Sequence, residues 1–253
     1  DGIIKKRRQE IENGSPVNFN FLDLLLVSNT QRDFENFEDE PPMNDIEIKA
    51  LLAEAIAASV ETVSSAVCFL VYNVAKNPKV LEKIRAEILD VFGPDKNSTI
   101  TYENLERCHY IDAVVNESMR YKAPAPANMR ILEGDEVIGE HYWPSGTWFW
   151  LNNDRIMNHP NNWNEPEHFN PDRFLNKELG GTGEKIRKCM FIPFGGGIRM
   201  CPGRQLALIE IKMIIILLYR KHSFELVNEN EPVKYYFNGS SHVYDLMVRL
   251  VLK

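Results

Sequence analysis

A cysteine follows a run of glycines at residues 194–203, where the sequence reads Phe-Gly-Gly-Gly-Ile-Arg-Met-Cys-Pro-Gly. Three consecutive glycines allow the backbone to lie flat against a planar partner. Cys201 stands at the expected start of an apolar helix, whose unpaired amides favour a thiolate, and Pro202 takes the first-turn position that proline prefers. Arg199 adds a fixed positive charge near the sulfur. Together these residues predict a protected, electron-rich sulfur ligand beside an anionic cofactor.

Two other interpretations of this segment compete with the ligand. Glycines before a helix are also typical of phosphate-binding loops, but those loops continue as Gly-Lys-[Ser/Thr], which this sequence lacks. A single cysteine is more often a small buried apolar side chain. The glycines and Arg199 around Cys201 favour the ligand over that second alternative.

Three further patterns could serve such a site. Glu117 and Arg120 lie three residues apart, on one face of an expected helix. The segment 171–174 reads Pro-Asp-Arg-Phe, and the segment 58–62 reads Ala-Ser-Val-Glu-Thr inside a long apolar helix. Taken alone, a Glu-Thr pair in a helix predicts no function.

In this order along the chain, these patterns resemble the signatures of the cytochrome P-450 family. The Phe, Gly, Arg, Cys and Gly of the family's haem-binding signature fall at 194, 197, 199, 201 and 203. The resemblance covers essentially the whole chain, but only the second half of a family member. It implies that Cys201 is the axial ligand of the haem iron. It also implies haem contacts from these residues: Ala58, Arg130, Phe194, Gly195, Gly197, Arg199 and Gly203.

The resemblance assigns a scaffold role to a group of three charged residues. It joins Glu117, Arg120 and Arg173 in a buried ion network that holds the cysteine loop in shape, so these are not a catalytic acid–base pair. Arg130 and Arg199 would bond to the haem propionates. For Arg130, a solvated surface position is an equally good interpretation.

The distal side of the haem would be formed by the long helix. The resemblance implies that Thr62 hydrogen-bonds dioxygen and that Glu61 helps to relay protons to it, because splitting the O–O bond consumes protons. One residue departs from the family pattern, since Ser59 replaces a glycine. Two outcomes are open: serine fits this position less well than glycine, or its hydroxyl bonds back to a carbonyl four residues earlier and bends the helix.

Around these residues the sequence predicts a mainly α fold with small β-sheets, and the resemblance implies that this is the C-terminal haem-binding half of the cytochrome P-450 fold. A helix over 46–75 would extend ~45 Å, enough to cross a domain. Short strands are expected over 128–132, 136–138 and 147–151. The expected segments of this partial domain are helices in 1–45, the distal oxygen-binding helix 46–75, the Glu-x-x-Arg helix 109–122, an irregular meander with the cysteine loop 158–200, the proximal helix 202–220 and C-terminal strands 221–253.

Composition excludes several other classes of protein. The chain has 36 acidic and 29 basic residues, a formal charge of −7, which argues against a nucleic-acid surface. We interpret the one basic cluster, residues 5–8, as a solvated helix face. Four cysteines without Cys-x-x-Cys spacing form neither a disulfide framework nor a zinc site. The most apolar stretch, 206–219, is interrupted by two charges, so we expect neither a membrane span nor a signal peptide. Because the chain begins at Asp1 within an expected helix, we interpret it as a fragment.

The resulting hypothesis is a haem-thiolate monooxygenase acting on a small, lipophilic organic substrate. Its electrons would come from a separate reductase, an NADPH-dependent flavoprotein, because the sequence carries no flavin or nicotinamide fingerprint. We expect the full-length protein to face the cytoplasm at the endoplasmic reticulum, anchored by a segment before Asp1. A haem-thiolate isomerase or dehydratase acting on peroxides, and a non-catalytic truncated remnant, remain as alternatives.

Overall fold

The structure is a computed structural model that describes residues 2–18, 20–28, 42–175 and 189–252. The chain divides into two compact units, Asp1–Val60 and Glu61–Lys253. Helix α3, Asp45–Lys76, contributes its first part to one unit and its remainder to the other. It is one residue longer at each end than the helix that the apolar spacing predicts.

The first unit contains α1 (Gly2–Glu12), α2 (Phe21–Val27) and the start of α3. A reciprocal cap begins α3: the Asn44 side chain accepts from the amide of Glu47 at 3.1 Å, and the Glu47 carboxylate accepts from the Asn44 amide at 2.8 Å. Residues 29–41 of this unit lie outside the described part of the chain. Ile4, Leu26 and Ile48 form the small apolar core of this unit.

The basic cluster of α1 is not the solvated face that the sequence predicts. Arg7 makes a two-pronged ion pair with the buried Asp23, with N–O distances of 2.8 and 2.6 Å. This pairing holds the pKa of the Asp23 carboxyl well below its usual range. Arg8 donates to Asp45 at 2.8 Å and to the Met43 carbonyl at 3.0 Å. The prediction was wrong for these two arginines because their acidic partners come from α2 and α3, not from neighbouring positions.

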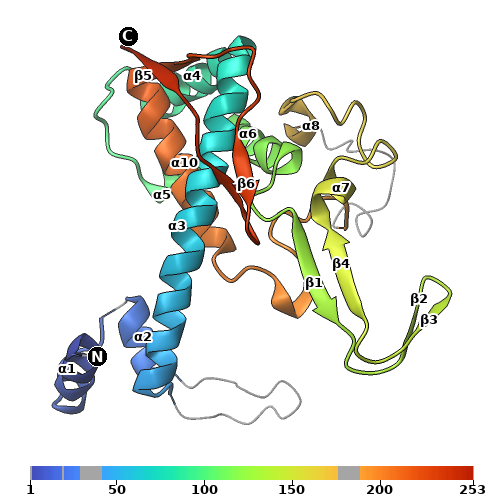
Figure 1. The fold of residues 1–253 in the computed structure, drawn as a ribbon. Coiled ribbons are helices and arrows are strands. Elements are labelled where there is room, and N and C mark those ends of the chain that lie inside the picture. The colour runs from blue at the N-terminus through green and yellow to red at the C-terminus, as the bar shows by residue number, and fades with distance from the viewer. Residues whose placement is uncertain (1, 19, 29–41, 176–188, 253) are drawn as a thin grey trace. The chain divides into compact units, whose positions relative to one another are not determined.

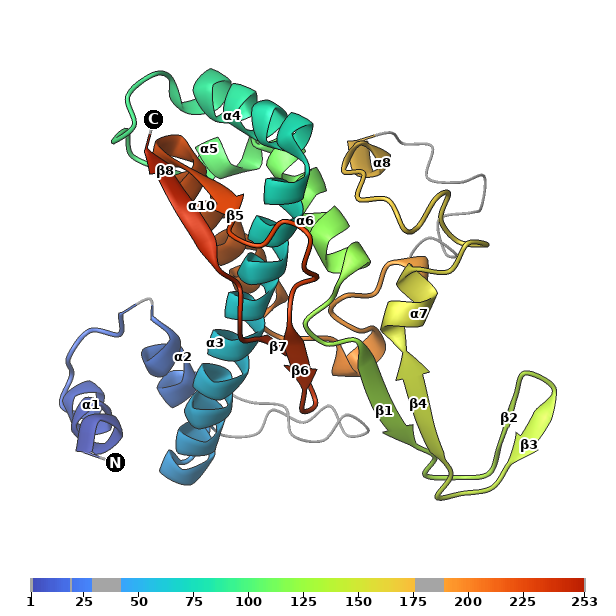
Figure 2. The same ribbon diagram turned by 45° about the horizontal axis from the view of Figure 1, so that its top comes forward.

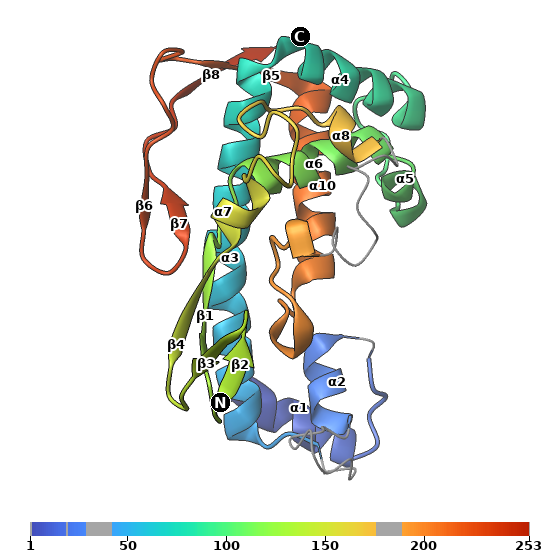
Figure 3. The ribbon, with the colours of Figure 1, turned by 90° about the vertical axis from the view of Figure 1, so that its right-hand side faces the viewer.

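The second unit has a helical core. The rest of α3 packs with α4 (Pro78–Phe92), α6 (His109–Tyr121) and α10 (Arg204–Lys221), and the short α5 (Tyr102–Glu106) lies beside α10 (Figures 1 and 3). Their contact surfaces are aliphatic, with Leu70, Val74, Ile84, Ile111, Val114, Ile215 and Ile216 at or close to zero exposure. The buried Lys212 ties α10 to Asp112 and to the Leu105 carbonyl, at 2.8 and 2.7 Å.

Small antiparallel sheets flank this core. In the described residues there are four, each of two strands. They pair β1 (Ala127–Ile131) with β4 (Trp148–Asn152), β2 (Glu136–Ile138) with β3 (His141–Trp143), β5 (His222–Leu226) with β8 (Val248–Leu252), and β6 (Tyr235–Phe237) with β7 (Ser241–Val243). Figure 2 shows β5 and β8 beside α10 and the β6–β7 hairpin beside α3. The sequence predicted β1, β2 and β4 but not β3.

Two boundaries in the cysteine region differ from expectation. Helix α10 begins at Arg204, with Gly203 as its cap residue, so Pro202 lies in a turn before the helix and not in its first turn. The irregular segment 158–200 contains the short helix α8 (Asp172–Leu175) and the 3₁₀ turn η1 (Gly197–Arg199), and follows α7 (Asn153–Met157). Its residues 176–188 lie outside the described part of the chain.

By length and composition alone, α3 could cross a membrane, and it is the one such helix among the described residues. The sequence predicts no membrane span and takes 206–219 as the longest apolar stretch, whereas α3 is the helix that meets this criterion. Core helices pass the same test, and Phe69, Leu70 and Val74 in the second half of α3 are buried in the helical core.

Candidate haem site

The cysteine loop is a tight backbone turn that ends just before α10. The Cys201 amide donates to the Phe194 carbonyl at 2.9 Å, and the Met200 amide donates to the Gly197 carbonyl at 3.1 Å. Gly195 and Gly197 adopt φ angles of +74° and +69°, a conformation that side chains disfavour. The glycines are therefore required by the turn itself, and the turn fixes the position of the cysteine.

The face of this loop fits a flat apolar group. Cys201 is exposed, and so are its apolar neighbours Ile198, Met200 and Leu206, at 72, 43 and 57%. A side chain added at Gly196 or Gly197 would meet no atom within 4 Å, so both glycines border open space. Exposed apolar residues around an accessible sulfur are the surroundings that a thiolate-ligated porphyrin needs.

The other three cysteines are poorer ligand candidates. Cys108 is fully buried in the helical core, and burial raises the pKa of its thiol to about 11. Burial also raises the pKa of the Cys68 thiol, on α3. Cys189 is exposed, but it lies outside the glycine turn. Cys201 is thus the exposed cysteine that lies in the glycine turn.

Glu117, Arg120 and Arg173 meet in one buried ion network. Arg120 binds Glu117 through two hydrogen bonds, of 2.7 and 2.9 Å, and neither residue has any exposed surface. Arg173, from α8, donates to the same carboxylate at 3.1 Å. The backbone amide of Asn170 adds a fourth donor at 2.8 Å. The resemblance predicts that these three charged residues form one network, and the structure shows the contacts between them.

The guanidinium groups of the two arginines also donate hydrogen bonds to loop carbonyls. Arg120 donates to the carbonyls of Met157 and Pro166 and to the Asn158 side chain, at 2.9–3.1 Å. Arg173 donates to the carbonyls of Asn164 and His168, at 2.9 and 3.1 Å. Sequence reasoning missed these partners, because a backbone carbonyl leaves no signal in the residue type. The network therefore organises much of the irregular segment after α7.

An aromatic chain connects this network with the cysteine loop. The Arg120 guanidinium lies 5.4 Å from the ring centre of the buried Trp163. Trp163 meets Phe191 edge to face at 6.3 Å, and Phe174 meets Phe191 at 5.0 Å. Phe191 lies three residues before Phe194, where the loop begins. Edge-to-face contacts between large aromatic side chains thus link the ion network to the cysteine loop.

The expected distal residues fall on both sides of the boundary between the units. Ala58 and Ser59 belong to the first unit, Glu61 and Thr62 to the second. Ser59 donates to the Ile56 carbonyl at 3.3 Å, three residues earlier, and α3 continues through it as a regular helix. Thr62 is half-buried, and the Glu61 carboxylate is largely exposed.

The two expected propionate ligands have different settings. Arg199 is exposed at the end of η1, two residues before Cys201. Arg130 is half-buried on β1 and donates to the Met129 carbonyl at 2.8 Å. The side-chain nitrogen Nδ2 of Asn128, on the same strand, lies 3.6 Å from the position that a Cβ atom would take at Gly195. Strand β1 thus lies beside the cysteine loop, while the roles of both arginines stay predictions.

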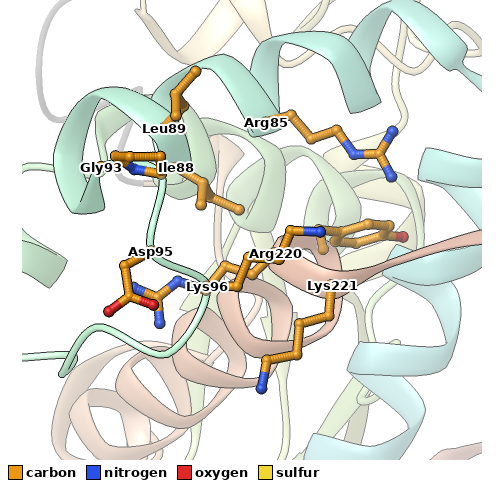
Figure 4. A pocket seen from close by; sticks show the side chains of 10 residues that line it. Arg85, Ile88, Leu89, Gly93, Asp95, Lys96, Arg220 and Lys221 are labelled. Carbon is orange, nitrogen blue, oxygen red and sulfur yellow. The ribbon is translucent and has the colours of Figure 1, made fainter. Parts of the chain in front are cut away.

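A separate cavity of about 220 Å³ lies between the ends of α4 and α10 (Figure 4). Basic side chains line it, among them Arg85, Arg220 and Lys221, together with Ile88 and Leu89. Arg220 and Lys221 bind Ser98 and Asn97 of the adjoining loop, at 2.7–2.8 Å. None of the sequence-predicted site residues lines this cavity, so it is distinct from the cysteine loop.

The chain matches known proteins over most of its length. The sequence model described as cytochrome P450 covers residues 1–243. Cytochrome P450 3A17 of Cavia porcellus is 31% identical over 229 residues, which is 90% of this chain and 44% of that protein. Cytochrome P450 4d1 of Drosophila melanogaster is 32% identical over 84% of this chain and 40% of that protein. The mitochondrial 1,25-dihydroxyvitamin D(3) 24-hydroxylase of Mus musculus is 32% identical over 74% of this chain and 35% of that protein.

Solved structures show the same fold. The haem domain of cytochrome P450DA superposes with a TM-score of 0.81 at 25% identity, covering all of this chain and 53% of that one. A cytochrome P450 described as CYP102L1 gives a TM-score of 0.78 at 20% identity and covers 56% of that chain. The chain thus spans less than half the length of the curated relatives and about half of each structure. Its fold is mainly α with small sheets, the haem-binding part of these domains.

Proposed function

The chain belongs to the cytochrome P450 family of haem-thiolate oxidoreductases, and from that premise we propose that it forms the haem-holding part of a monooxygenase. The observation that carries this proposal is the accessible Cys201 at the end of a glycine turn, surrounded by exposed apolar residues. Cys201 would be the axial ligand of the iron. When bound, thiolate-ligated haem supplies the redox chemistry that activates dioxygen.

The residues of the cysteine loop would hold the cofactor in place. Gly195, Gly197 and Gly203 keep the backbone free of side chains on this face, and Phe194 begins the loop. Arg199, with Arg130 from β1, would bind the two carboxylates through charge-assisted hydrogen bonds. The ion network of Glu117, Arg120 and Arg173 would keep the loop rigid through Trp163 and Phe191. None of these groups needs to move a proton.

Proton movement would fall to α3. Thr62 would hold a hydrogen bond to the oxygen substrate, and Glu61 would supply protons to it from the solvent side. The exposure of the Glu61 carboxylate supports this, because a group that takes protons from water must reach it. Ala58, one turn before Thr62 on the helix, would offer a small surface to the cofactor.

The test of the iron ligand uses the reduced, carbon-monoxide-bound protein that carries this chain together with an N-terminal half. Cys201→Ala should abolish the thiolate-type absorption, because no other sulfur takes its place. The exposed Cys189 provides a matched control, and Cys189→Ala should leave the spectrum unchanged. A thiolate spectrum in the Cys201→Ala variant would contradict the assignment.

The test of the distal residues is coupling, the product formed per reducing equivalent consumed. Thr62→Ala should lower coupling by about tenfold or more and release peroxide, since losing positioned proton transfer costs ~10²–10⁴ in rate. Haem content should stay constant. Ser64→Ala, on the same helix, is the control and should keep coupling. Undiminished turnover of a peroxide substrate without any reductase would instead favour the isomerase or dehydratase alternative.

The substrate and the electron donor follow from the same proposal. We propose a small lipophilic substrate that lies near Ala123–Met129 and the β6–β7 hairpin, and an NADPH-dependent flavoprotein reductase as the partner. Support for the substrate class comes from the exposed apolar side chains of β1 and β4, including Met129, Ile131 and Trp150. Reconstitution with such a reductase, followed by NADPH consumption with candidate substrates, tests both points.

We propose the endoplasmic reticulum as the site of action, facing the cytoplasm. One relative carries a mitochondrial name, so fractionation of cells that express the natural gene must compare both membranes. Enrichment with mitochondria would overturn the proposal.

The 253 residues expressed alone should neither bind haem tightly nor turn over substrate. Their apolar surface at α3 and the cysteine loop stays open, with Ile56, Val60, Ile198 and Leu206 exposed. Each 100 Å² of apolar surface left in water forfeits ~2.5 kcal/mol, which is large against a usual total of ~5–15 kcal/mol. Haem titration with light scattering as the control decides this. A monomer with one thiolate-ligated haem would show that the chain is a complete minimal haem domain.

A further inference from the structure

The β6–β7 hairpin brings a histidine against the helix that carries Glu61. The Nε2 atom of His242, on β7, lies 3.8 Å from a carboxylate oxygen of Glu61 on α3. The same nitrogen lies 2.9 Å from the Ser240 hydroxyl. The Ser240 hydroxyl is within hydrogen-bond distance of Nε2, and the Glu61 carboxylate lies farther away, at a distance where the contact is electrostatic.

The imidazole is held firmly, whereas the carboxylate is not. The ring of Tyr236 stacks on the His242 ring at 4.8 Å, with only 14° between the planes. The hairpin is tied to the segment after α6, because the Ser241 amide donates to the Pro124 carbonyl at 2.7 Å. His242 is buried, but 62% of the Glu61 side chain is exposed. The fixed member of the pair is therefore the histidine.

Other charged groups near the hairpin have partners of their own. Lys234 pairs with Asp245 and Glu231, at 2.9 and 3.4 Å. Lys122 lies over the Tyr235 ring and 3.9 Å from Asp154. In the described part of the chain, Glu61 is the acidic residue whose carboxylate lies within ion-pair distance of His242. The interaction is thus specific to the residue expected to deliver protons.

We propose that His242 is a positioning residue for Glu61, which it holds on the hairpin side of α3 in a fixed orientation beside Thr62. This inference rests on the proposed role of Glu61. It adds that the orientation of the Glu61 carboxylate depends on His242, which lies 181 positions later in the sequence. His242 belongs to a hairpin that is expected to line the substrate pocket. A change in that hairpin would alter proton delivery without touching α3.

The experiment compares His242→Gln, Glu61→Gln and the double variant in the haem-loaded protein that carries this chain. Coupling should fall about two- to fivefold in His242→Gln, the factor that a partly exposed ion pair can supply. The double variant should be no worse than Glu61→Gln, because both changes remove one interaction. Haem content and the thiolate spectrum should remain normal. His141→Gln, at an exposed histidine of β3, is the matched control and should change nothing.

A second measurement does not depend on turnover or on a histidine variant that folds. With ¹⁵N-labelled histidine in the diamagnetic carbon-monoxide complex, the Nε2 resonance of His242 should move in Glu61→Gln at constant pH. An unmoved resonance overturns the inference, and so does an additive loss in the double variant. Normal coupling in His242→Gln beside lost coupling in Glu61→Gln also overturns it, but leaves the proposed function intact. Normal coupling in Glu61→Gln would instead refute the role of Glu61 itself.

Discussion

The ion network and the cysteine loop differ in how far their side chains are exposed and in what those side chains contact. In the network, Glu117 and Arg120 have no exposed surface, and their charged groups bind one another, Arg173 and several loop carbonyls. In the loop, Cys201 and its apolar neighbours are exposed, and backbone hydrogen bonds close the turn. The scaffold is therefore complete within these residues, whereas the site that it supports is open to a partner molecule. Stability and function are divided between the two regions.

The largest effect should come from breaking the network. Arg120→Leu should destabilise the folded protein by ~3–5 kcal/mol, because Glu117 would keep a buried charge without its main partner. Chemical unfolding measures this free energy. Lys83→Met is the matched control, since it breaks an exposed pair with Asp172 and should cost less than ~1 kcal/mol. Equal losses for the two variants would mean that the network is not a distinct structural element.

A smaller loss should follow from a side chain in the glycine turn. Gly197→Ala should cost ~1–2 kcal/mol, because a φ of +69° is unfavourable for alanine even though the space is open. Gly134→Ala also enters open space, but without a positive φ, and should be close to neutral. If Gly197→Ala were neutral too, the turn would not need its glycines, and the difference between a strained loop and a relaxed scaffold would disappear.

The smallest effect on stability should come from the residue that we propose as the iron ligand. Cys201→Ala should change the unfolding free energy of the protein without haem by no more than ~0.5 kcal/mol, because the side chain is exposed. With haem added, the wild type alone should gain stability from thiolate ligation. A large loss without haem would show that Cys201 also supports the fold, contrary to the division between the two regions.

Much of the site could be predicted because its chemistry depends on residue type at short spacing. A glycine run, an arginine and a cysteine stand within ten residues, and Glu117 and Arg120 lie one helical turn apart. The apolar spacing of α3 likewise predicted its ends to within one residue. Such patterns are local, so they survive without knowledge of the rest of the fold. The amphipathic helices and the paired strands β1 and β4 could be predicted for the same reason.

Contacts between distant segments could not be read in this way. The sequence predicts Arg7 and Arg8 to be surface charges, but Asp23 of α2 and Asp45 of α3 pair with them. Pro202 lies before α10 and not in its first turn. The pairing of His242 with Glu61 and the carbonyls that bind Arg120 depend on loops whose paths no spacing specifies. The sequence by itself determined which groups could do chemistry, because that depends on functional groups and local periodicity. The tertiary structure decided which of them meet, because meeting depends on how remote segments pack.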